Sequence, residues 1–338
     1  MIARPAMIAV LAAIAVLAAS EPALLIVEKA SGRVGFFDAS GALVKEVDIG
    51  THPHEMAFSA DGRYAYITDN GVMVMTEKAP GQNRIPMVDV INRVKVGEID
   101  LGEHRRPHGI DFDPATGHVL VTTELPSALL ILDPRSRKVI DTYDVQGKAP
   151  HMVRLAPDGH TAFVTCTDTS NLSIIDLKTH AVTTIPTGAR PQGIVFSPDF
   201  ARVYIANSDG HTITVVDARA KKLIGDIPVG SQHSGPVRVA ITRDGKTAIS
   251  ALQLDHAISF ADIAMMREEK TIPLPGAPVS MTLSLDGKTA YCSVQDSDTV
   301  FVISVPERHI TANFHAPLHS GPDPVMPIPL IARHKTER

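Results

Sequence analysis

The chain is poor in residues that support several common functions. Tryptophan is absent and aromatic residues make up 4% of the sequence, so few flat side chains are available for bases or sugar rings to stack on. Lysine and arginine number 32 against 37 aspartates and glutamates, and the formal net charge is -5. A chain without a basic excess lacks the electrostatic footprint for a phosphate backbone. We therefore expect no nucleic-acid partner.

Cysteine is also scarce. Only Cys166 and Cys292 occur, and they lie in sequence units that are not neighbours. A disulfide needs Cα atoms within about 7 Å, so both are interpreted as small core residues. The chain has no Cys-x-x-Cys-His motif, which excludes c-type haem. Gly-x-Ser-x-Gly, Walker, dinucleotide and His-Glu-x-x-His motifs are absent as well, so no function is indicated by those signatures.

Long apolar runs are missing except at the N-terminus. Met7 to Ala19 is uninterrupted, with Arg4 before it and small residues after it. This run is shorter than the roughly 20 residues of a membrane span and is typical of an export signal. We expect residues 1–20 to be a signal peptide, residues 21–330 to form one domain and residues 331–338 to be a flexible tail. The mature protein is then periplasmic or secreted; an uncleaved anchor is the alternative.

A repeat dominates the rest of the sequence. In one unit, Ile194 to Phe196 reads as a first strand, Ala201 to Ala206 as a second, Thr212 to Asp217 as a third and Leu223 to Val229 as a fourth. Four antiparallel strands in about 42 residues is the size of a propeller blade. The predicted third strands end at Asp38, Asp89, Asp133, Asp176, Asp217, Asp262 and Ser304. The sequence therefore predicts seven blades.

The first unit is incomplete. Ala23 to Gly50 holds only the second, third and fourth strands, whereas Gly321 to Met326 repeats the opening of a first strand. We expect the two termini to share one blade, because closure of the ring removes exposed sheet edges. The predicted fold class is an all-β seven-bladed propeller with four antiparallel strands per blade.

The second strands of the units carry a more specific signature, which is followed by Ile-Asp or Val-Asp in the third strands. It resembles the Tyr-Val-Thr-Asn (YVTN) repeat of bacterial seven-bladed propellers. That family contains YncE-like periplasmic propellers, lactonase-like proteins, surface-layer proteins and relatives of the d1-haem domain of cytochrome cd1 nitrite reductase. The resemblance implies the fold and leaves these functions open. The segments that carry it are Tyr66–Asp69, Phe163–Cys166, Tyr204–Asn207 and Tyr291–Val294.

Histidines gather at one end of the predicted ring. His54, His108 and His151 each follow the repeat proline, at the start of the innermost strand of three consecutive blades. Gln192 has the same position in the next blade. We expect these four side chains to form an arc at the mouth of the central channel and to bind a ligand.

The chemistry of this arc has two readings. Imidazole is a common ligand of transition metals, so the three histidines are candidates to hold a divalent metal or to flank the iron of a d1-type haem. Alternatively, each ring only bonds a backbone carbonyl at the rim and was copied with its repeat.

Four further residues are candidates for ligand binding at this mouth. Glu124 and Asp168 follow the second strands of two His-bearing blades, and a nearby carboxylate fixes the tautomer and tunes the pKa of an imidazole. Arg154 and Arg238, on inner strands, are candidates to hold an anionic group. The alternatives are turn formation for the two acids and ion pairs across blades for the arginines.

One unit contains an insertion, from Gly71 to Arg84. It belongs to the end of the ring that carries the histidines, and insertions in repeat proteins often lie on the binding face. We expect it to form a lid. Its Met73 and Met75 are soft-metal ligands or packing residues.

Two functions follow from these observations. The first is an exported binding or scaffold protein that takes a small molecule or a periplasmic protein at the His-rich mouth. The alternative is a metal- or d1-haem-dependent enzyme, a lactonase-like hydrolase or an oxidoreductase, that uses His54, His108 and His151.

Overall fold

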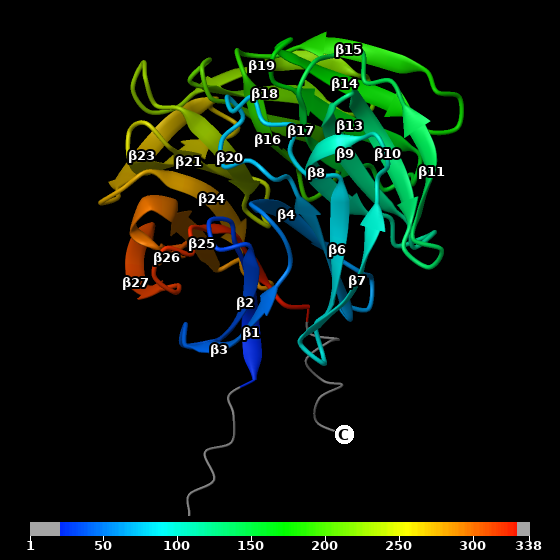
Figure 1. The fold of residues 1–338 in the computed structure, drawn as a ribbon. Helices are drawn as coiled ribbons and strands as arrows, with labels where there is room; N and C mark the ends of the chain where they lie inside the picture. Colours follow the sequence, from blue (N-terminus) through cyan, green and yellow to red (C-terminus); the bar gives the residue numbers. More distant parts are fainter. Residues whose placement is uncertain (1–20, 330–338) are drawn as a thin grey trace, which may run out of the picture.

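The computed structural model describes residues 21–329, which form 28 β-strands and one short 3-10 helix, Gln295–Ser297. The strands make seven four-stranded antiparallel sheets arranged as blades around a common axis (Figure 1). The predicted seven-bladed propeller is confirmed. The predicted signal peptide and tail lie outside the described residues. Within residues 21–329, no helix has the length and apolar character needed to cross a membrane.

Each blade is an up-and-down meander whose first strand is innermost. From the inner to the outer strand, the blades are as follows. Blade 1 is β28 (Pro322–Pro327), β1 (Pro22–Glu28), β2 (Arg33–Asp38) and β3 (Leu43–Asp48); blade 2 is β4 (Pro53–Phe58), β5 (Tyr64–Asp69), β6 (Arg84–Asp89) and β7 (Val94–Asp100); blade 3 is β8 (Arg105–Phe112), β9 (Val119–Leu125), β10 (Ser127–Asp133) and β11 (Lys138–Tyr143); blade 4 is β12 (Pro150–Leu155), β13 (Thr161–Cys166), β14 (Asn171–Asp176) and β15 (Val182–Pro186); blade 5 is β16 (Pro191–Phe196), β17 (Arg202–Asn207), β18 (Thr212–Asp217) and β19 (Lys222–Pro228); blade 6 is β20 (Pro236–Ile241), β21 (Thr247–Leu252), β22 (Ala257–Asp262) and β23 (Arg267–Pro273); blade 7 is β24 (Pro278–Leu283), β25 (Thr289–Val294), β26 (Thr299–Ser304) and β27 (His309–His315).

The position of a strand in its blade explains its composition. Both faces of β17 are covered by neighbouring blades, so Val203 to Asn207 are all buried and read as an apolar run rather than an alternation. The outer strand β19 faces solvent and is mostly exposed. Cys166 and Cys292 are free thiols buried in blade cores, as predicted.

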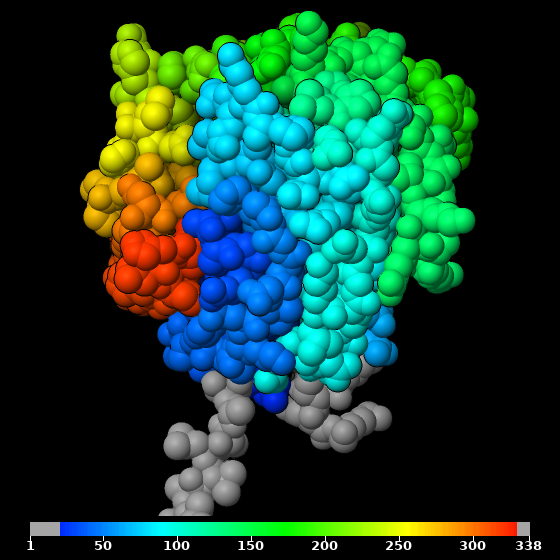
Figure 2. Space-filling model, viewed as in Figure 1, coloured from blue at the N-terminus to red at the C-terminus, as the bar shows by residue number. Residues whose placement is uncertain are grey.

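The hydrophobic core consists of layers between adjacent blades. Tyr66 of blade 2 stacks on Phe112 of blade 3 with ring centroids 5.9 Å apart, and Phe37 of blade 1 meets Phe314 of blade 7 at 5.8 Å. In the space-filling view, the red-orange blade 7 lies directly against the blue blade 1 (Figure 2). Each large apolar side chain buried in such a layer stabilises the ring by about 1.5–3 kcal/mol.

The two termini complete one sheet. Ile26 of β1 lies opposite Val325 of β28, and both side chains are fully buried. The pairing continues beyond the strands, because Lys29 N donates to Gly321 O at 3.0 Å. This confirms the predicted closure, and Figure 1 shows the red C-terminal segment running beside the blue β1. All seven blades therefore have four strands within residues 21–329.

The turns between first and second strands require a left-handed residue. Gly62 and Gly159 have φ of +67° and +71°, a conformation that costs glycine little. Phe200 takes the same place in blade 5 with φ of +57°, while Asp199 accepts a hydrogen bond from Ser197 Oγ at 2.6 Å and stabilises the turn.

Candidate functional site

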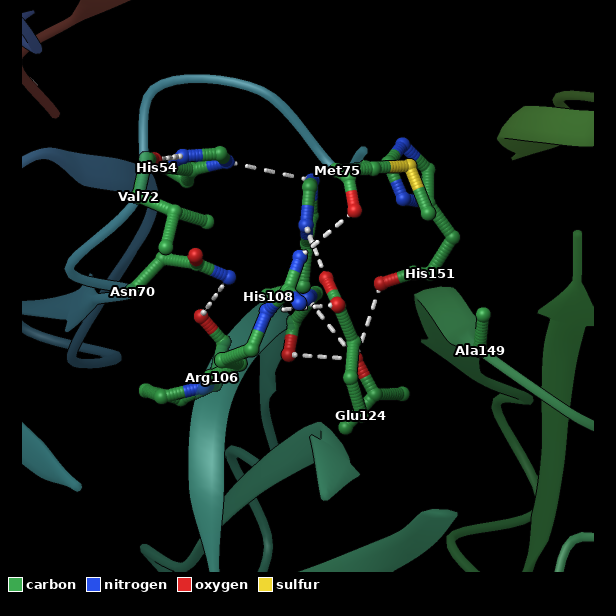
Figure 3. A network of polar contacts seen from close by, with 12 residues as sticks. His54, Asn70, Val72, Met75, Arg106, His108, Glu124, Ala149 and His151 are labelled. Carbon is green, nitrogen blue, oxygen red and sulfur yellow. Dashed lines mark hydrogen bonds and ion pairs between the residues drawn. The ribbon is translucent and has the colours of Figure 1, made fainter. Parts of the chain in front are cut away.

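Three inner strands bring the predicted histidines together at one end of the channel. His54 and His151 are the second residues of β4 and β12, His108 lies in β8, and each residue is 3% exposed. The ring centroids of His54 and His108 are 4.6 Å apart, and those of His108 and His151 are 3.7 Å apart. The predicted arc is therefore present as a contiguous, buried cluster (Figure 3).

The close stacking depends on the backbone beside the rings. A Cβ atom on Gly109 would collide with the carbonyl oxygen of His151 and lie 2.6 Å from Met152 Cα. Only glycine lets β8 and β12 approach so closely. Gly193 serves the same purpose between the next two blades, since its Cβ would lie 2.8 Å from Val237 O.

The threonine of the strand repeat positions the histidines, a role that the sequence analysis missed. Thr68 Oγ1 donates to His108 O and Thr122 Oγ1 donates to His151 O, each at 2.8 Å. Thr165 Oγ1 donates to Gln192 O at 2.9 Å. Each threonine thus ties its own blade to the first channel-facing residue of the next blade. The signal was visible as a threonine in the middle of successive second strands.

The insertion covers the cluster. His54 Nε2 lies 2.8 Å from Val72 O, and Met73 to Thr76 line the same cavity as the three imidazoles. Arg106 holds the segment down, with Nη2 donating to Met75 O at 2.9 Å and Nη1 to Glu77 O at 3.1 Å. The segment lies over the His-rich mouth as the predicted lid, and Figure 3 shows it arching between His54 and Met75.

The two predicted acidic partners have different positions. Glu124 Oε2 lies 2.9 Å from Arg106 Nε, and its Oε1 lies 3.4 Å from His108 Nδ1. Burial raises the pKa of Glu124, and the charge of Arg106 opposes this shift. Asp168 is not in the cluster: it is exposed and lines a neighbouring surface pocket. The reason is that β9 extends to Leu125 and keeps Glu124 inside, whereas β13 ends at Cys166 and the chain turns outward.

The protons on the imidazoles can be assigned from their partners. Burial lowers the pKa of all three rings well below the ordinary value of 6.5, so they are neutral at pH 7. The carbonyl of Val72 only accepts, so His54 carries its proton on Nε2 and has a bare Nδ1. That Nδ1 faces His108 Nε2 at 3.5 Å. Polar contacts therefore link the lid to His54 and His54 to His108, while Glu124 and Arg106 lie beside His108.

We call the cavity beneath the lid the His chamber. It has a volume of about 210 Å³, and its lining includes Gln192 and Arg238. Three basic side chains, Lys29, Arg190 and Arg238, face it against one acidic side chain, Asp323. Pockets for drug-sized ligands span roughly 300–1,000 Å³. The chamber therefore suits a ligand of few atoms.

A cluster of buried charges forms the floor of the His chamber. Arg238 pairs with Glu55 and lies 4.0 Å from Asp323, which in turn lies 4.0 Å from Lys29. Burial raises the pKa of both carboxyls and lowers the pKa of Lys29. We call these four residues the charged partition. The predicted ion pairing across blades is thus present for Arg238.

Beyond the partition lies a second cavity, of about 600 Å³, which also reaches Arg238 and Glu55. We call it the far funnel. Arg154 lines the far funnel and not the His chamber. The prediction that Arg154 acts at the His-rich mouth is therefore corrected. It is the fourth residue after its repeat proline, whereas Arg238 is the second, and this places Arg154 deeper along the channel.

The predicted metal or d1-type haem at the imidazoles stays a prediction. Within residues 21–329, no group of three or more histidine, cysteine, aspartate or glutamate side chains is arranged to hold a metal ion. His151 stacks on His108 with the ring planes inclined by 41°.

Fold and site together define a closed seven-bladed propeller whose central channel is divided into a lidded polar chamber and an open funnel. A family model described as lactonase, 7-bladed beta-propeller, matches residues 136–325, more than half of the chain. The protein belongs to this family. No curated protein matches the chain.

Solved structures share the architecture. Hydrazine synthase of Kuenenia stuttgartiensis superposes with a TM-score of 0.70 at 19% identity, covering 82% of this chain and 90% of that chain. Dihydro-heme d1 dehydrogenase NirN in complex with DHE gives a TM-score of 0.66 at 19% identity, covering 90% of this chain and 67% of that chain. At this identity the likeness concerns the fold alone.

Proposed function

We propose that this propeller is an exported binding protein that takes a small organic or inorganic anion in the His chamber. The observation that carries the proposal is that Lys29, Arg190 and Arg238 line a cavity of about 210 Å³ whose lining includes one acidic side chain, Asp323. Lys29 is the central group. Its only ion-pair partner within residues 21–329 is Asp323 at 4.0 Å, and burial lowers its pKa.

An anion in the chamber would offset the effect of burial on Lys29. A negative charge beside Lys29 favours its protonated form, and the N–H groups of neutral imidazoles and of Gln192 supply hydrogen bonds without adding charge. The lid then excludes water and strengthens each of these contacts. The small volume restricts the ligand to a few heavy atoms, such as a short carboxylate.

The test is a thermal-shift and calorimetric titration with acetate, glycolate and phosphate. Binding raises the free energy of unfolding by about 2.7 kcal/mol when the ligand is present at about 100 times its Kd. Lys29→Met weakens the binding, whereas the control Lys222→Met, at an exposed position of β19, leaves it unchanged. Absence of any shift, or equal binding by Lys29→Met, contradicts the proposal.

Hydrolysis of a small lactone is the second candidate, and the family match supports it. A neutral imidazole of the cluster would take a proton from water as the water oxygen attacks the ring carbonyl. The ring C–O bond then breaks, and the same proton is returned to the departing alkoxide. The hydroxy-carboxylate produced is the kind of small anion that Lys29 suits.

This activity is tested with γ-butyrolactone by following acid release at constant pH. Activity lost in His108→Gln and kept in His104→Gln supports catalysis by the cluster. Export is tested separately, by fractionating cells and sequencing the N-terminus of the mature protein: a start near Glu21 supports the proposed cleavage, and retention of Met1 contradicts it.

A further inference from the structure

The far funnel is larger and less polar than the His chamber. The inner strands of all seven blades contribute to its wall, and its volume is about 600 Å³. The wall is mainly apolar, and several of its side chains are only partly buried: Phe58, Phe112, Val195, Leu283 and Met326. The volume falls in the range of small-molecule sites, roughly 300–1,000 Å³.

Four charged side chains reach the inner part of this apolar wall: Glu55, Asp111, Arg154 and Arg238. Arg238 pairs with Glu55. The carboxylate of Asp111 accepts hydrogen bonds from Phe112 N at 3.0 Å and from Leu155 N at 2.8 Å.

Arg154 is close enough to Asp111 for its charge to oppose the burial that raises the pKa of that carboxyl. Its Nη1 donates to Val153 O at 2.9 Å and approaches Ile110 O at 3.5 Å, both of them uncharged acceptors. Within residues 21–329, no carboxylate lies within ion-pair distance of its guanidinium, and Nη2 and Nε have no acceptor. A guanidinium binds a carboxylate through two parallel hydrogen bonds. The Nη2 and Nε groups of Arg154 are therefore available to a carboxylate inside an apolar cavity.

We propose that the far funnel binds an amphipathic carboxylate, with its apolar body against the funnel wall and its carboxylate on Arg154. The apolar wall accounts for the body of the ligand, and the guanidinium accounts for its single negative charge. This site is separate from the His chamber, because the charged partition lies between the two cavities. It goes beyond the anion binding proposed above and does not depend on it.

The probes are octanoate, 1-octanol and octylamine, which share one chain and differ in the head group. Calorimetric titration of the full chain is expected to give the order octanoate, octanol, octylamine from tightest to weakest. A hydrogen bond to a charged group contributes enough that Arg154→Met lowers octanoate affinity roughly ten- to hundred-fold and leaves octanol affinity unchanged. Arg154→Lys keeps the charge but cannot form two parallel hydrogen bonds, so its octanoate affinity is expected to lie between those of the wild type and Arg154→Met.

A second pair of variants locates the ligand. Ala60 is exposed at the rim of the funnel, so Ala60→Trp obstructs the cavity without disturbing the core and abolishes binding of octanoate and octanol. Ala220→Trp, in an exposed outer turn, is the control. Lys29→Met tests the His chamber and leaves octanoate binding unchanged, so failure here is distinguishable from failure of the proposal above.

Four results would overturn the inference. These are no octanoate binding, equal affinity for octanol and octanoate, unchanged octanoate affinity in Arg154→Met, or full binding by Ala60→Trp. The last would place the ligand elsewhere on the molecule.

Discussion

Acidification should destabilise the propeller through its buried imidazoles, and His151 isolates the effect. The residue is 3% exposed, and burial lowers its pKa well below 6.5, helped by the nearby charges of Arg238, Lys29 and Arg190. Its Nδ1 has no hydrogen-bond partner among the described residues. Removing the ring therefore disrupts little besides packing against His108.

The sign and size follow from proton linkage. Below about pH 6.5 the unfolded chain protonates this histidine, while the folded protein keeps it neutral until its lowered pKa is reached. The unfolded state then binds more protons, so the free energy of unfolding falls as the pH falls. A single group contributes about 1.4 kcal/mol per pH unit in this window. The raised pKa values of Glu55, Asp111 and Asp323 act in the opposite direction, so only a comparison of variants isolates the imidazole.

The assay is urea unfolding of wild type and His151→Gln at a series of pH values from about 7 to about 5. The wild type is expected to lose about 1.4 kcal/mol more than the variant for each pH unit below about 6. His160→Gln, in a surface turn at the other end of the ring, should follow the wild type. Equal pH dependence in the wild type and His151→Gln would refute the assignment of a neutral buried ring.

Three further outcomes test the architecture. Arg106→Gln removes both bonds to the lid and leaves Glu124 unpaired, so trypsin should cleave after Lys78 much faster than in the wild type. Arg105 donates one hydrogen bond to the same segment, at Gly81 O, so Arg105→Gln should give an intermediate rate. Equal cleavage rates would contradict the role of Arg106. Arg238→Met leaves two buried carboxyls without a partner and should lower the free energy of unfolding by about 3–5 kcal/mol in urea. Adding Glu55→Gln should restore most of this loss, and a purely additive effect in the double variant would exclude the pair. A chain ending at Gly321 lacks β28 and should show no cooperative thermal transition by circular dichroism, and a native-like transition would exclude the shared blade.

The fold was predictable because it follows from local patterns repeated along the chain. Six aspartates and Ser304 end successive third strands and so give the number of blades, and the repeat opening at Gly321 to Met326 supplies the missing strand. The histidine cluster was predictable for the same reason: residues in equivalent positions of adjacent blades must be neighbours in a ring.

Other features depended on distances that the sequence does not contain. Asp168 and Glu124 lie near the ends of equivalent strands, yet Asp168 is exposed and Glu124 is buried, because β9 runs to Leu125 whereas β13 ends at Cys166. The division of the channel arises from Arg238 meeting Glu55, residues 183 positions apart in the chain.

By itself, the sequence determined the number of blades, their closure and the ring of residues at the His-rich mouth, since strand periodicity and repeats act over short stretches of chain. Only the tertiary structure decided which charges neutralise one another, which cavity each arginine faces and that the lid rests on His54. Those outcomes depend on how closely the seven inner strands approach the axis, and this approach is a property of the assembled ring.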